Sequence, residues 1–457
     1  MWPVTRHGER VIDHIKDEWG KLKMDKRWLN IIIGIILFFP FITGCARREV
    51  NEVVLNFWHP WGLYQEELEK YVKEEFEAMH PGIKLNISSV PPGLGGDKLL
   101  TSIVGGTPPE VALVDGSVMI DWAHRKALRP LNEFLQKSGI KKEDFFLPSW
   151  RQNVYEGRVY GLPLNADPNF ALFWNKDLFK KANLDPERPP ATLKELDEYI
   201  EKLNKFNEKG RLERTGMIPW DLYGGSNALY TWGWIFGGKF YDPSTGKLTM
   251  NHPKNIEALE WLISWAKRLG IRNIEGFFGQ FTGRDGIEPF FMGKKAMVIR
   301  FYREIERLSK YAPDINFGVA PIPYPEGGRK NFAWIGGWCI VLPRGSKHPE
   351  EAFKFIRWLT ATPEGANAIH KATRMLSAYK ESPTFEKMKD DPKKRVFLEI
   401  LKNSDWQRPL VPIQRLMQHE LNQAVEFSLL GIKTPKEALD EAQVKLQKEL
   451  NEIKKRY

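Results

Sequence analysis

The chain has 457 residues, with 68 Lys and Arg against 58 Asp and Glu, which gives a formal net charge of +10. This excess is small for the length and is spread along the chain, whereas nucleic-acid-binding proteins usually concentrate basic charge on one face. We therefore expect no nucleic-acid partner. The two cysteines, Cys45 and Cys339, do not form a cluster with ligand spacing, so we expect no metal site and no cofactor, and Cys339 is predicted to be a small buried apolar residue.

The stretch at residues 28–45 is the most distinctive segment near the N-terminus. Basic residues precede it, residues 31–42 are mostly apolar, and small residues lead to Cys45. This order is typical of a secretory signal. The last four residues, Ile42-Thr43-Gly44-Cys45, resemble a bacterial lipobox, which implies that Cys45 receives lipid and becomes the first mature residue. We expect a signal peptide at 1–44, a lipidated tether at 45–51, and a mature protein anchored on the outer face of the cell membrane.

Other interpretations of this segment remain open. A transmembrane helix needs about 20 apolar residues, and this run is shorter and contains Asn30 and Pro40. A buried core helix would normally show a polar face, and an ordinary cleaved signal would carry Cys45 by coincidence. Signals usually begin only a few residues before the apolar run, whereas a longer tract precedes it here, so we also expect that translation starts at Met24.

The first part of the mature chain alternates between strand and helix patterns. Residues 53–58 and 108–115 are apolar runs, and residues 83–87 alternate between apolar and polar side chains, as in strands. Residues 64–79 repeat apolar side chains with helical spacing, and residues 96–104 indicate another helix. This order predicts an α/β fold whose parallel sheet has helical crossovers. Ligands bind beyond the carboxyl ends of strands in such sheets, so we expect a site there.

Residues 159–179 contain a Gly-Leu-Pro turn and an extended run that ends in Trp174-Asn175 before a helix. The segment resembles the crossover of the extracellular solute-binding proteins of ABC importers, in the sugar-binding, maltose-binding-protein-like family, where Tyr-Asn is usual. Five later segments resemble motifs of that family in the expected order: a capped helix at 191–200, a strand entry at 290–299, a return crossover at 315–323, a Gly-Gly strand with its helix at 336–359, and a closing helix at 434–443.

The resemblance implies a two-lobed, periplasmic-binding-protein-like fold of class II, in which each lobe is a mixed β-sheet flanked by helices and hinge crossovers join the lobes. The implied N-terminal lobe comprises residues 52–163 and 319–365, and the C-terminal lobe comprises residues 164–318 and 366–457. The resemblance also implies a monomer that binds carbohydrate without catalysis and delivers it to the permease subunits of an ABC importer. The abundance of aromatic residues favours an oligosaccharide.

Sugars present flat C–H faces and a belt of hydroxyl groups, so their sites combine aromatic rings with planar polar groups. Several such residues follow predicted strands or turns, each with a structural role as the alternative. Trp122, Trp261, Trp265 and Trp358 have apolar neighbours at helical spacing and are predicted to be core residues. Trp232 and Trp234 would face the same side if they lay on a strand. The predicted ligand-binding residues are Trp58, His59, Trp61, Asp115, Ser117, Asp167, Tyr230, Trp232, Trp234, Arg300, Tyr302 and Trp338.

Three other functions compete with this prediction. The same fold could bind a non-sugar solute such as a glycerophosphodiester or a peptide, and a phosphate ligand would need clustered cations. A secreted glycoside hydrolase would need two carboxyl groups placed across one bond, and no local pattern singles out such a pair. A lipoprotein scaffold would show no stabilisation by any small ligand.

Overall fold

The computed structural model describes residues 52–90, 94–281 and 288–456. Residues 53–457 form a compact unit of their own. The predicted signal peptide, the lipidation site Cys45 and the tether at 45–51 lie outside the described residues. Within the described ranges, no helix is long and apolar enough to cross a membrane.

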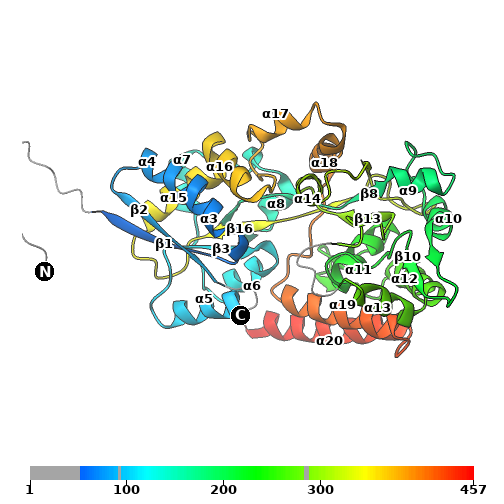
Figure 1. Ribbon diagram of the computed structural model, residues 1–457. Coiled ribbons are helices and arrows are strands. Elements are labelled where there is room, and N and C mark those ends of the chain that lie inside the picture. The colour runs from blue at the N-terminus through cyan, green and yellow to red at the C-terminus, as the bar shows by residue number, and fades with distance from the viewer. Residues whose placement is uncertain (1–51, 91–93, 282–287, 457) are drawn as a thin grey trace, which may run out of the picture. The chain divides into compact units, whose positions relative to one another are not determined.

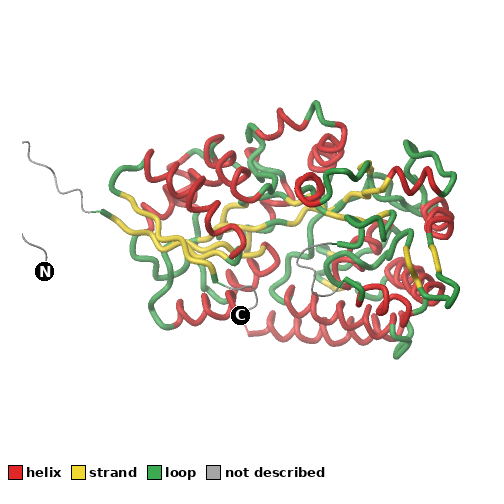
Figure 2. The backbone as a smooth tube through the Cα atoms, viewed as in Figure 1, coloured by secondary structure: helices red, strands yellow, loops and turns green. Residues whose placement is uncertain are grey.

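The first of two main sheets has five strands (Figures 1 and 2). Its β1, β2 and β3 run parallel, as the strand and helix order of the sequence predicts, whereas β16 runs antiparallel to both of its neighbours. Across the sheet the strands are β2 (Ile83–Ser89), β1 (Val53–His59), β3 (Val111–Asp115), β16 (Trp338–Val341) and β6 (Gly161–Pro163). Cys339 is buried in β16, as predicted.

Helices cover this sheet, and together they form the first lobe. The helix predicted over 64–79 is confirmed as α3 (Gln65–Leu68), the π turn η3 (Glu69–Lys73) and α4 (Glu74–Met79). Its predicted apolar stripe packs into the core through Leu68, Val72 and Phe76. The other helices of this lobe are η2 (Gly62–Tyr64), α5 (Leu94–Val104), η4 (Gly116–Val118), α6 (Met119–His124), α7 (Asn132–Ser138), η5 (Lys142–Asp144), α8 (Leu147–Arg151), α15 (Pro349–Ala361) and α16 (Pro363–Thr373).

The second main sheet is antiparallel, with β8 (Ala171–Asn175) between β13 (Met297–Arg300) and β14 (Phe317–Ala320). Figure 1 shows helices above and below this sheet in the second lobe. They are α9 (Lys176–Lys181), α10 (Leu193–Leu203), α11 (Gly225–Ile235), α12 (Pro253–Leu269), α13 (Ile271–Gly279), α14 (Glu304–Tyr311), α17 (Thr384–Met388), α18 (Pro392–Asn403), α19 (Gln414–Leu429) and α20 (Pro435–Arg456).

Short ladders complete the described structure, in the pairs β4 (Val154–Tyr155) with β5 (Arg158–Val159), β9 (Lys205–Phe206) with β10 (Leu212–Arg214), and β11 (Tyr241–Asp242) with β12 (Lys247–Leu248).

Strand β8 contributes to two separate hydrophobic cores. Side chains alternate between the faces of a strand. Ala171 and Phe173 accordingly pack in the core that also fills the first lobe, whereas Leu172 and Trp174 pack in the core of α11, α12 and α19. One strand therefore ties both cores together.

Two extended segments cross between the lobes, β7 (Asp167–Asn169) and β15 (Trp334–Gly336), and they pair antiparallel. Glycines permit this close crossing. A Cβ on Gly336 would lie 2.6 Å from Asn169 Nδ2, and a Cβ on Gly337, whose φ is +149°, would lie 2.2 Å from the Asn165 carbonyl oxygen. The two glycines thus let the crossing segments approach each other.

Two of the predicted lobe boundaries fall inside secondary-structure elements. The boundary at 318–319 would divide β14, which pairs with β8 along its whole length. The boundary at 365–366 would divide α16, which packs on α15 and on the π turn η3 of the first lobe. The motifs from which these boundaries were predicted mark strands and helices rather than the loops between them, and the boundaries stay predictions.

Removing the N-cap of α10 is expected to destabilise the second lobe. The capped helix expected at 191–200 is confirmed, and its cap is a capping box: the Glu195 backbone N–H donates to Thr192 Oγ1 at 3.2 Å, and the Thr192 N–H donates to the Glu195 carboxylate at 3.2 Å. We expect Thr192→Ala to lower the free energy of unfolding by about 1 kcal/mol in urea denaturation. Lys194→Ala, at an exposed position in the same turn, is the control. Equal effects of the two changes would contradict a role for the cap.

Candidate functional site

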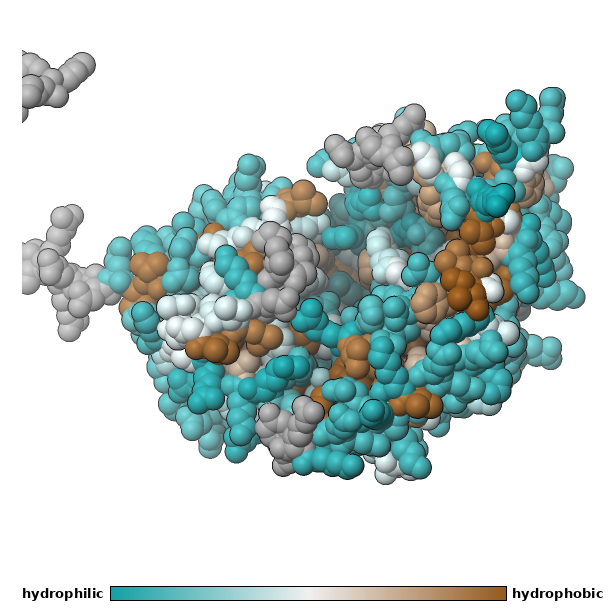
Figure 3. Space-filling view, turned by 90° about the horizontal axis from the view of Figure 1, so that it is seen from below, coloured by the Kyte–Doolittle hydropathy of each residue, from teal (hydrophilic) through white to brown (hydrophobic). Residues whose placement is uncertain are grey.

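A groove lies where β1 and β3 end, and the face shown in Figure 3 is hollowed between the two lobes. The groove contains two adjoining cavities, of 390 Å³ and 310 Å³, within the usual range of about 300–1,000 Å³ for ligand pockets. Both cavities are lined by Asp115, Asn227, Trp338 and Arg408, so they share a wall. The first also reaches Trp58, His59 and Ser117, and the second reaches Trp61, Asp167 and Tyr302.

Eight of the twelve predicted ligand-binding residues therefore line one groove. They reach it because the parallel strands β1 and β3 end at the same edge and the crossing strand β7 passes beside them. That these residues bind a ligand stays a prediction. A shared site requires them to lie around one groove, and they do. Trp122, which was expected in the core, is buried and also lines the first cavity.

Aromatic rings form one wall of the groove. The rings of Trp61 and Trp338 lie 5.4 Å apart, edge to face, and Tyr64 packs edge to face on the other side of Trp61 at 6.5 Å. Trp338 is half-buried, so part of its ring remains open to the groove. Trp58 is half-buried too, with the Lys98 ammonium 4.9 Å from its ring. Rings held in this way suit the stacking of apolar ligand faces.

His59 holds the loop that carries Trp61. Its Nδ1 accepts the backbone N–H of Trp61 at 3.2 Å, so the ring proton must lie on Nε2, which donates to Gln65 Oε1 at 2.9 Å. Burial lowers the pKa of His59, which the hydrogen bond with Gln65 only partly offsets. His59 is thus neutral, and both of its nitrogens are used within the protein. We infer that it positions the loop, although its ring also lines the cavity.

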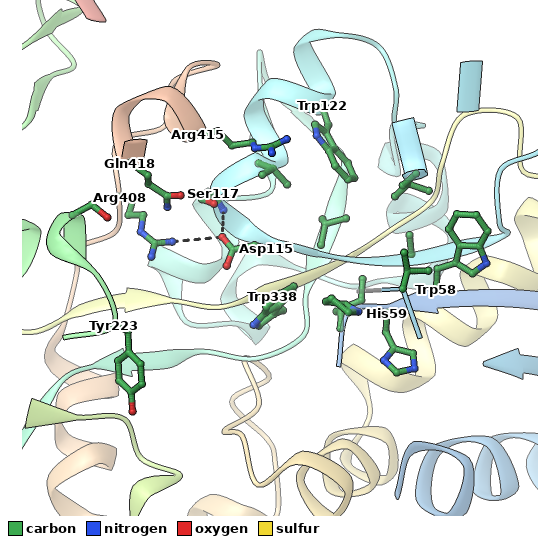
Figure 4. A pocket seen from close by; sticks show the side chains of 18 of the residues that line it. Trp58, His59, Asp115, Ser117, Trp122, Tyr223, Trp338, Arg408, Arg415 and Gln418 are labelled. Carbon is green, nitrogen blue, oxygen red and sulfur yellow. Dashed lines mark hydrogen bonds and ion pairs between the residues drawn. The ribbon is translucent and has the colours of Figure 1, made fainter. Parts of the chain in front are cut away.

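A polar network crosses the shared wall of the cavities (Figure 4). Asp115 Oδ1 accepts the backbone N–H of Ser117 at 2.8 Å and lies 3.5 Å from Arg408 Nη1. Arg408 also donates from Nη2 to Asn227 Oδ1 at 3.0 Å, and its guanidinium lies over the Trp334 ring at 4.7 Å. Asp115 therefore caps the 3-10 helix η4, which is a structural role. It leaves the other carboxylate oxygen, Oδ2, without a partner within the described part of the chain.

Both arginines and carboxylates line the groove. Asp167 lines the second cavity together with Arg303 and Arg408. Burial raises the pKa of Asp167 to about 6, against the opposing effect of the Arg303 charge. Arg303 also donates from Nη1 to the Tyr64 hydroxyl at 3.1 Å, which joins the second lobe to the first.

We expect Asp167 to make stability depend on pH. The folded state holds this proton more tightly than the unfolded chain, where an Asp has a pKa near 3.9, so the free energy of unfolding should fall as the pH rises from about 4 to about 6. Asp167→Asn should remove this loss and raise stability at pH 7.5, by at most about 3 kcal/mol, with no gain at pH 4. Melting temperatures at both pH values test this.

The matched control for Asp167 is Asp405→Asn, since Asp405 is exposed and pairs with Arg151 on the surface at 2.8 Å. A variant at Asp167 that is no more stable than the wild type at pH 7.5 would show that the nearby arginines, rather than burial, determine its ionisation.

The other four predicted residues do not line the groove. Tyr230, Trp232 and Trp234 lie on helix α11 rather than on a strand, and all three are buried in the second core. Their alternation was misleading because a helix that is buried on all sides shows no apolar stripe. Arg300 is also buried, and its guanidinium binds the carboxylates of Asp221 and Glu288. For Arg300 the structure thus shows the structural role, an ion pair, that was the alternative to ligand binding.

Sequence reasoning missed most of the second-lobe wall. Arg303 directly follows Tyr302 and could have been included by the same argument, since both follow strand β13. The others come from two loops, from strand β15 and from helices α11 and α19, where no local pattern marks them as lining residues. Besides Arg303, the missed lining residues include Tyr223, Ser226, Asn227, Trp334, Arg408, Arg415, Gln418 and Asn422.

No group of three or more His, Cys, Asp or Glu side chains is arranged to hold a metal ion among residues 52–90, 94–281 and 288–456.

Comparisons with known proteins identify relatives with this architecture. The family model described as bacterial extracellular solute-binding protein matches residues 61–366. The solved structure of CpMnBP1 with mannotriose bound is 30% identical, with a TM-score of 0.75, and the match covers 86% of this chain and 99% of that one.

Two curated relatives are also similar. A Brucella abortus (strain 2308) protein, named only as a binding protein, is 27% identical over 341 residues, which cover 73% of this chain and 77% of that protein. The sn-glycerol-3-phosphate-binding periplasmic protein UgpB of Salmonella typhimurium is 27% identical over 341 residues, which cover 69% of this chain and 74% of UgpB. The family model and the shared two-lobed fold show that the chain belongs to the bacterial extracellular solute-binding proteins.

Proposed function

We propose that this chain binds a neutral oligosaccharide, with a short manno-oligosaccharide as the first candidate, in the groove between its lobes. The observation that carries the proposal is the groove itself, whose lining combines the rings of Trp58, Trp61 and Trp338 with planar polar groups on Asp115, Asn227 and Arg408. Rings can stack on sugar faces, while carboxylate, amide and guanidinium groups pair with neighbouring hydroxyls. The likeness to CpMnBP1, solved with mannotriose and with mannobiose, supports this ligand class.

The ligand would bind reversibly and without bond chemistry, and the lobes would close on it by bending at β7 and β15. We further propose that the chain hands the sugar to the permease subunits of an ABC importer, as a monomer. The lipobox-like sequence supports an anchor at Cys45 on the outer face of the membrane, and the crossing strands support a division into two lobes close to the predicted boundaries.

A second candidate ligand is a glycerol phosphate, favoured by Arg303, Arg408 and Arg415 in the groove and by the likeness to UgpB. Against it, Arg408 already pairs with Asp115, and Arg303 lies in the field of Asp167. A groove whose cations are partly neutralised by its own carboxylates suits a neutral ligand better than an anion.

Thermal unfolding of the purified mature protein with added ligands tests the proposal. Mannobiose and mannotriose are compared with maltose, glycerol 3-phosphate and a peptide mixture. At 100 times its dissociation constant a ligand stabilises the fold by about 2.7 kcal/mol, which visibly raises the melting temperature. If glycerol 3-phosphate alone stabilised the protein, the proposed ligand would be a glycerol phosphate and not a sugar. Stabilisation by none of the ligands would contradict the proposed ligand classes.

A further inference from the structure

A second cavity, of 840 Å³, lies in the first lobe outside the groove. It is formed by the turn after α6, the β4–β5 hairpin and the loop after β16. Lys126, Arg129, Arg158 and Arg344 line it, and Glu156 is the acidic residue of the lining. All four cations are exposed.

The four cations carry charge that the protein leaves uncompensated. None of them forms an ion pair within the part of the chain that the structure describes, whereas the neighbouring Arg125 does, with Asp121 at 2.7 Å. Exposed cations that converge on one hollow raise the local positive potential and attract anions. The cavity therefore fits a ligand with several negative charges.

Backbone hydrogen bonds fix the main chain at two of these residues. The Arg129 N–H donates to the Leu342 carbonyl at 2.9 Å, and the Arg344 N–H donates to the Ala127 carbonyl at 2.9 Å. The Arg129 guanidinium also lies over the Phe134 ring at 5.3 Å. Tyr155 lines the same cavity, and its hydroxyl is 2.8 Å from His124 Nδ1. Fixed arginines suit phosphate groups, and tyrosines are enriched at membrane interfaces.

The cavity lies at the edge of the sheet opposite the groove. Strand β16 runs antiparallel to β3, with Val341 paired to Ala112, so β16 ends where β3 begins. Strand β1 is parallel to β3, and its Phe57 pairs with Val111, so β1 begins four residues farther in the direction in which β16 runs. Figure 1 shows β1 beginning at the end of the first lobe farthest from the second lobe. Val53, the residue that follows the tether, and the loop after β16 that carries Arg344 thus lie toward the same end of the sheet.

Covalent geometry then limits how far this edge can lie from a lipidated Cys45. Eight peptide steps separate Cys45 from Val53, and each spans at most about 3.6 Å, so Val53 stays within about 30 Å of a lipidated Cys45. Anionic lipid headgroups are the polyanion present at that distance. Basic clusters beside a membrane anchor bind such surfaces.

We propose that this basic cavity binds anionic phospholipid headgroups, so that the first lobe rests on the membrane with its groove turned away from the lipid. The proposal rests on the proposed anchor at Cys45 and is independent of which ligand the groove takes. It gives the resting protein an orientation in which the groove opens toward the medium.

Energy transfer on vesicles tests this orientation. The mature, lipidated full chain carries a donor fluorophore on Lys347→Cys, an exposed position beside the cavity, or on Lys209→Cys in the second lobe. Both are reconstituted on vesicles of 70% phosphatidylcholine and 30% phosphatidylglycerol, or of phosphatidylcholine alone, with acceptor-labelled lipid. We expect at least twofold higher transfer from position 347 than from position 209 on the anionic vesicles, and loss of the difference on neutral vesicles or in 0.5 M salt.

Charge variants complete the test. Changing Lys126, Arg129, Arg158 and Arg344 together to Gln should abolish the difference, whereas changing four exposed second-lobe lysines to Gln should leave it intact. The control lysines are Lys180, Lys181, Lys202 and Lys209. Because Lys209 is changed to Gln in that variant, Lys205→Cys carries the second-lobe donor there instead.

Equal transfer from both positions on anionic vesicles, or a difference that survives the cavity variant, would overturn the proposal. The difference in energy transfer between positions 347 and 209 could instead be the same on both kinds of vesicle and disappear when 10 mM inorganic phosphate is added at constant ionic strength. That result would assign the cavity to a small anion and would overturn the membrane proposal. Failure of the anchor is distinguishable, because the protein would then not float with either vesicle and its mass would show an unmodified Cys45.

Discussion

Replacing Arg300 by Met is expected to lower the free energy of unfolding by about 3–5 kcal/mol, since removal of one partner from a buried ion cluster leaves the others uncompensated. Arg300 donates to Glu288 Oε2 from Nε at 3.0 Å and from Nη2 at 2.8 Å, and to Asp221 Oδ2 at 3.0 Å. Burial alone would raise the pKa of Asp221, but the charges of Lys295 and Arg300 hold it well below its usual value. Urea denaturation measures the loss.

The control for Arg300 is Arg268→Met, whose partner Glu201 is exposed, and there we expect less than about 1 kcal/mol. Ligand titration of Arg300→Met separates the two roles considered for this residue. We expect an unchanged dissociation constant. A loss of affinity of tenfold or more without a loss of stability would restore Arg300 as a ligand-binding residue.

Truncating Trp338 to Ala is expected to weaken oligosaccharide binding by about 30-fold, or about 2 kcal/mol, the typical cost of removing a central aromatic contact. Trp338 lines both cavities and supports the Trp61 ring, so its loss removes one stacking surface and loosens another. Isothermal titration with the sugar identified by the thermal screen gives the number. Trp338→Phe, which keeps a ring, should recover part of the affinity.

The control for Trp338 is Trp234→Phe, which keeps a ring in the second core. The sequence placed Trp234 among the ligand-binding residues, but the structure buries it against Tyr230 and Phe240. We expect a lower melting temperature and an unchanged dissociation constant for this variant. An affinity loss at Trp234 comparable to that at Trp338 would mean that the groove extends through the second core.

How far the sequence could predict the site depended on how local each signal was. Trp58 and Asp115 were found because each ends an apolar run, and strand ends meet at one edge of a parallel sheet. Arg408 and Asn227 are almost two hundred residues apart, and only tertiary packing places their side chains 3.0 Å from each other. Arg300 was assigned to the ligand because it follows a strand, but its partners come from distant loops that the sequence could not pair with it.

The fold was predictable for a related reason. The capping box at Thr192 and the apolar stripe on residues 65–79 are local patterns, and both are present in the structure. The sequence left open whether Trp232 and Trp234 lie on a strand, because a helix buried on every side, such as α11, lacks the polar face by which helices are recognised.

The alternation of β8 between two cores has a consequence for how the protein unfolds. Phe173 and Trp174 are neighbours in one strand, yet they belong to different hydrophobic clusters. Melting either cluster would expose one face of the strand and weaken its pairing with β13 and β14, on which the other cluster packs. The lobes should therefore lose their structure together, in one calorimetric transition, and amides of β8 should exchange with solvent only through global unfolding.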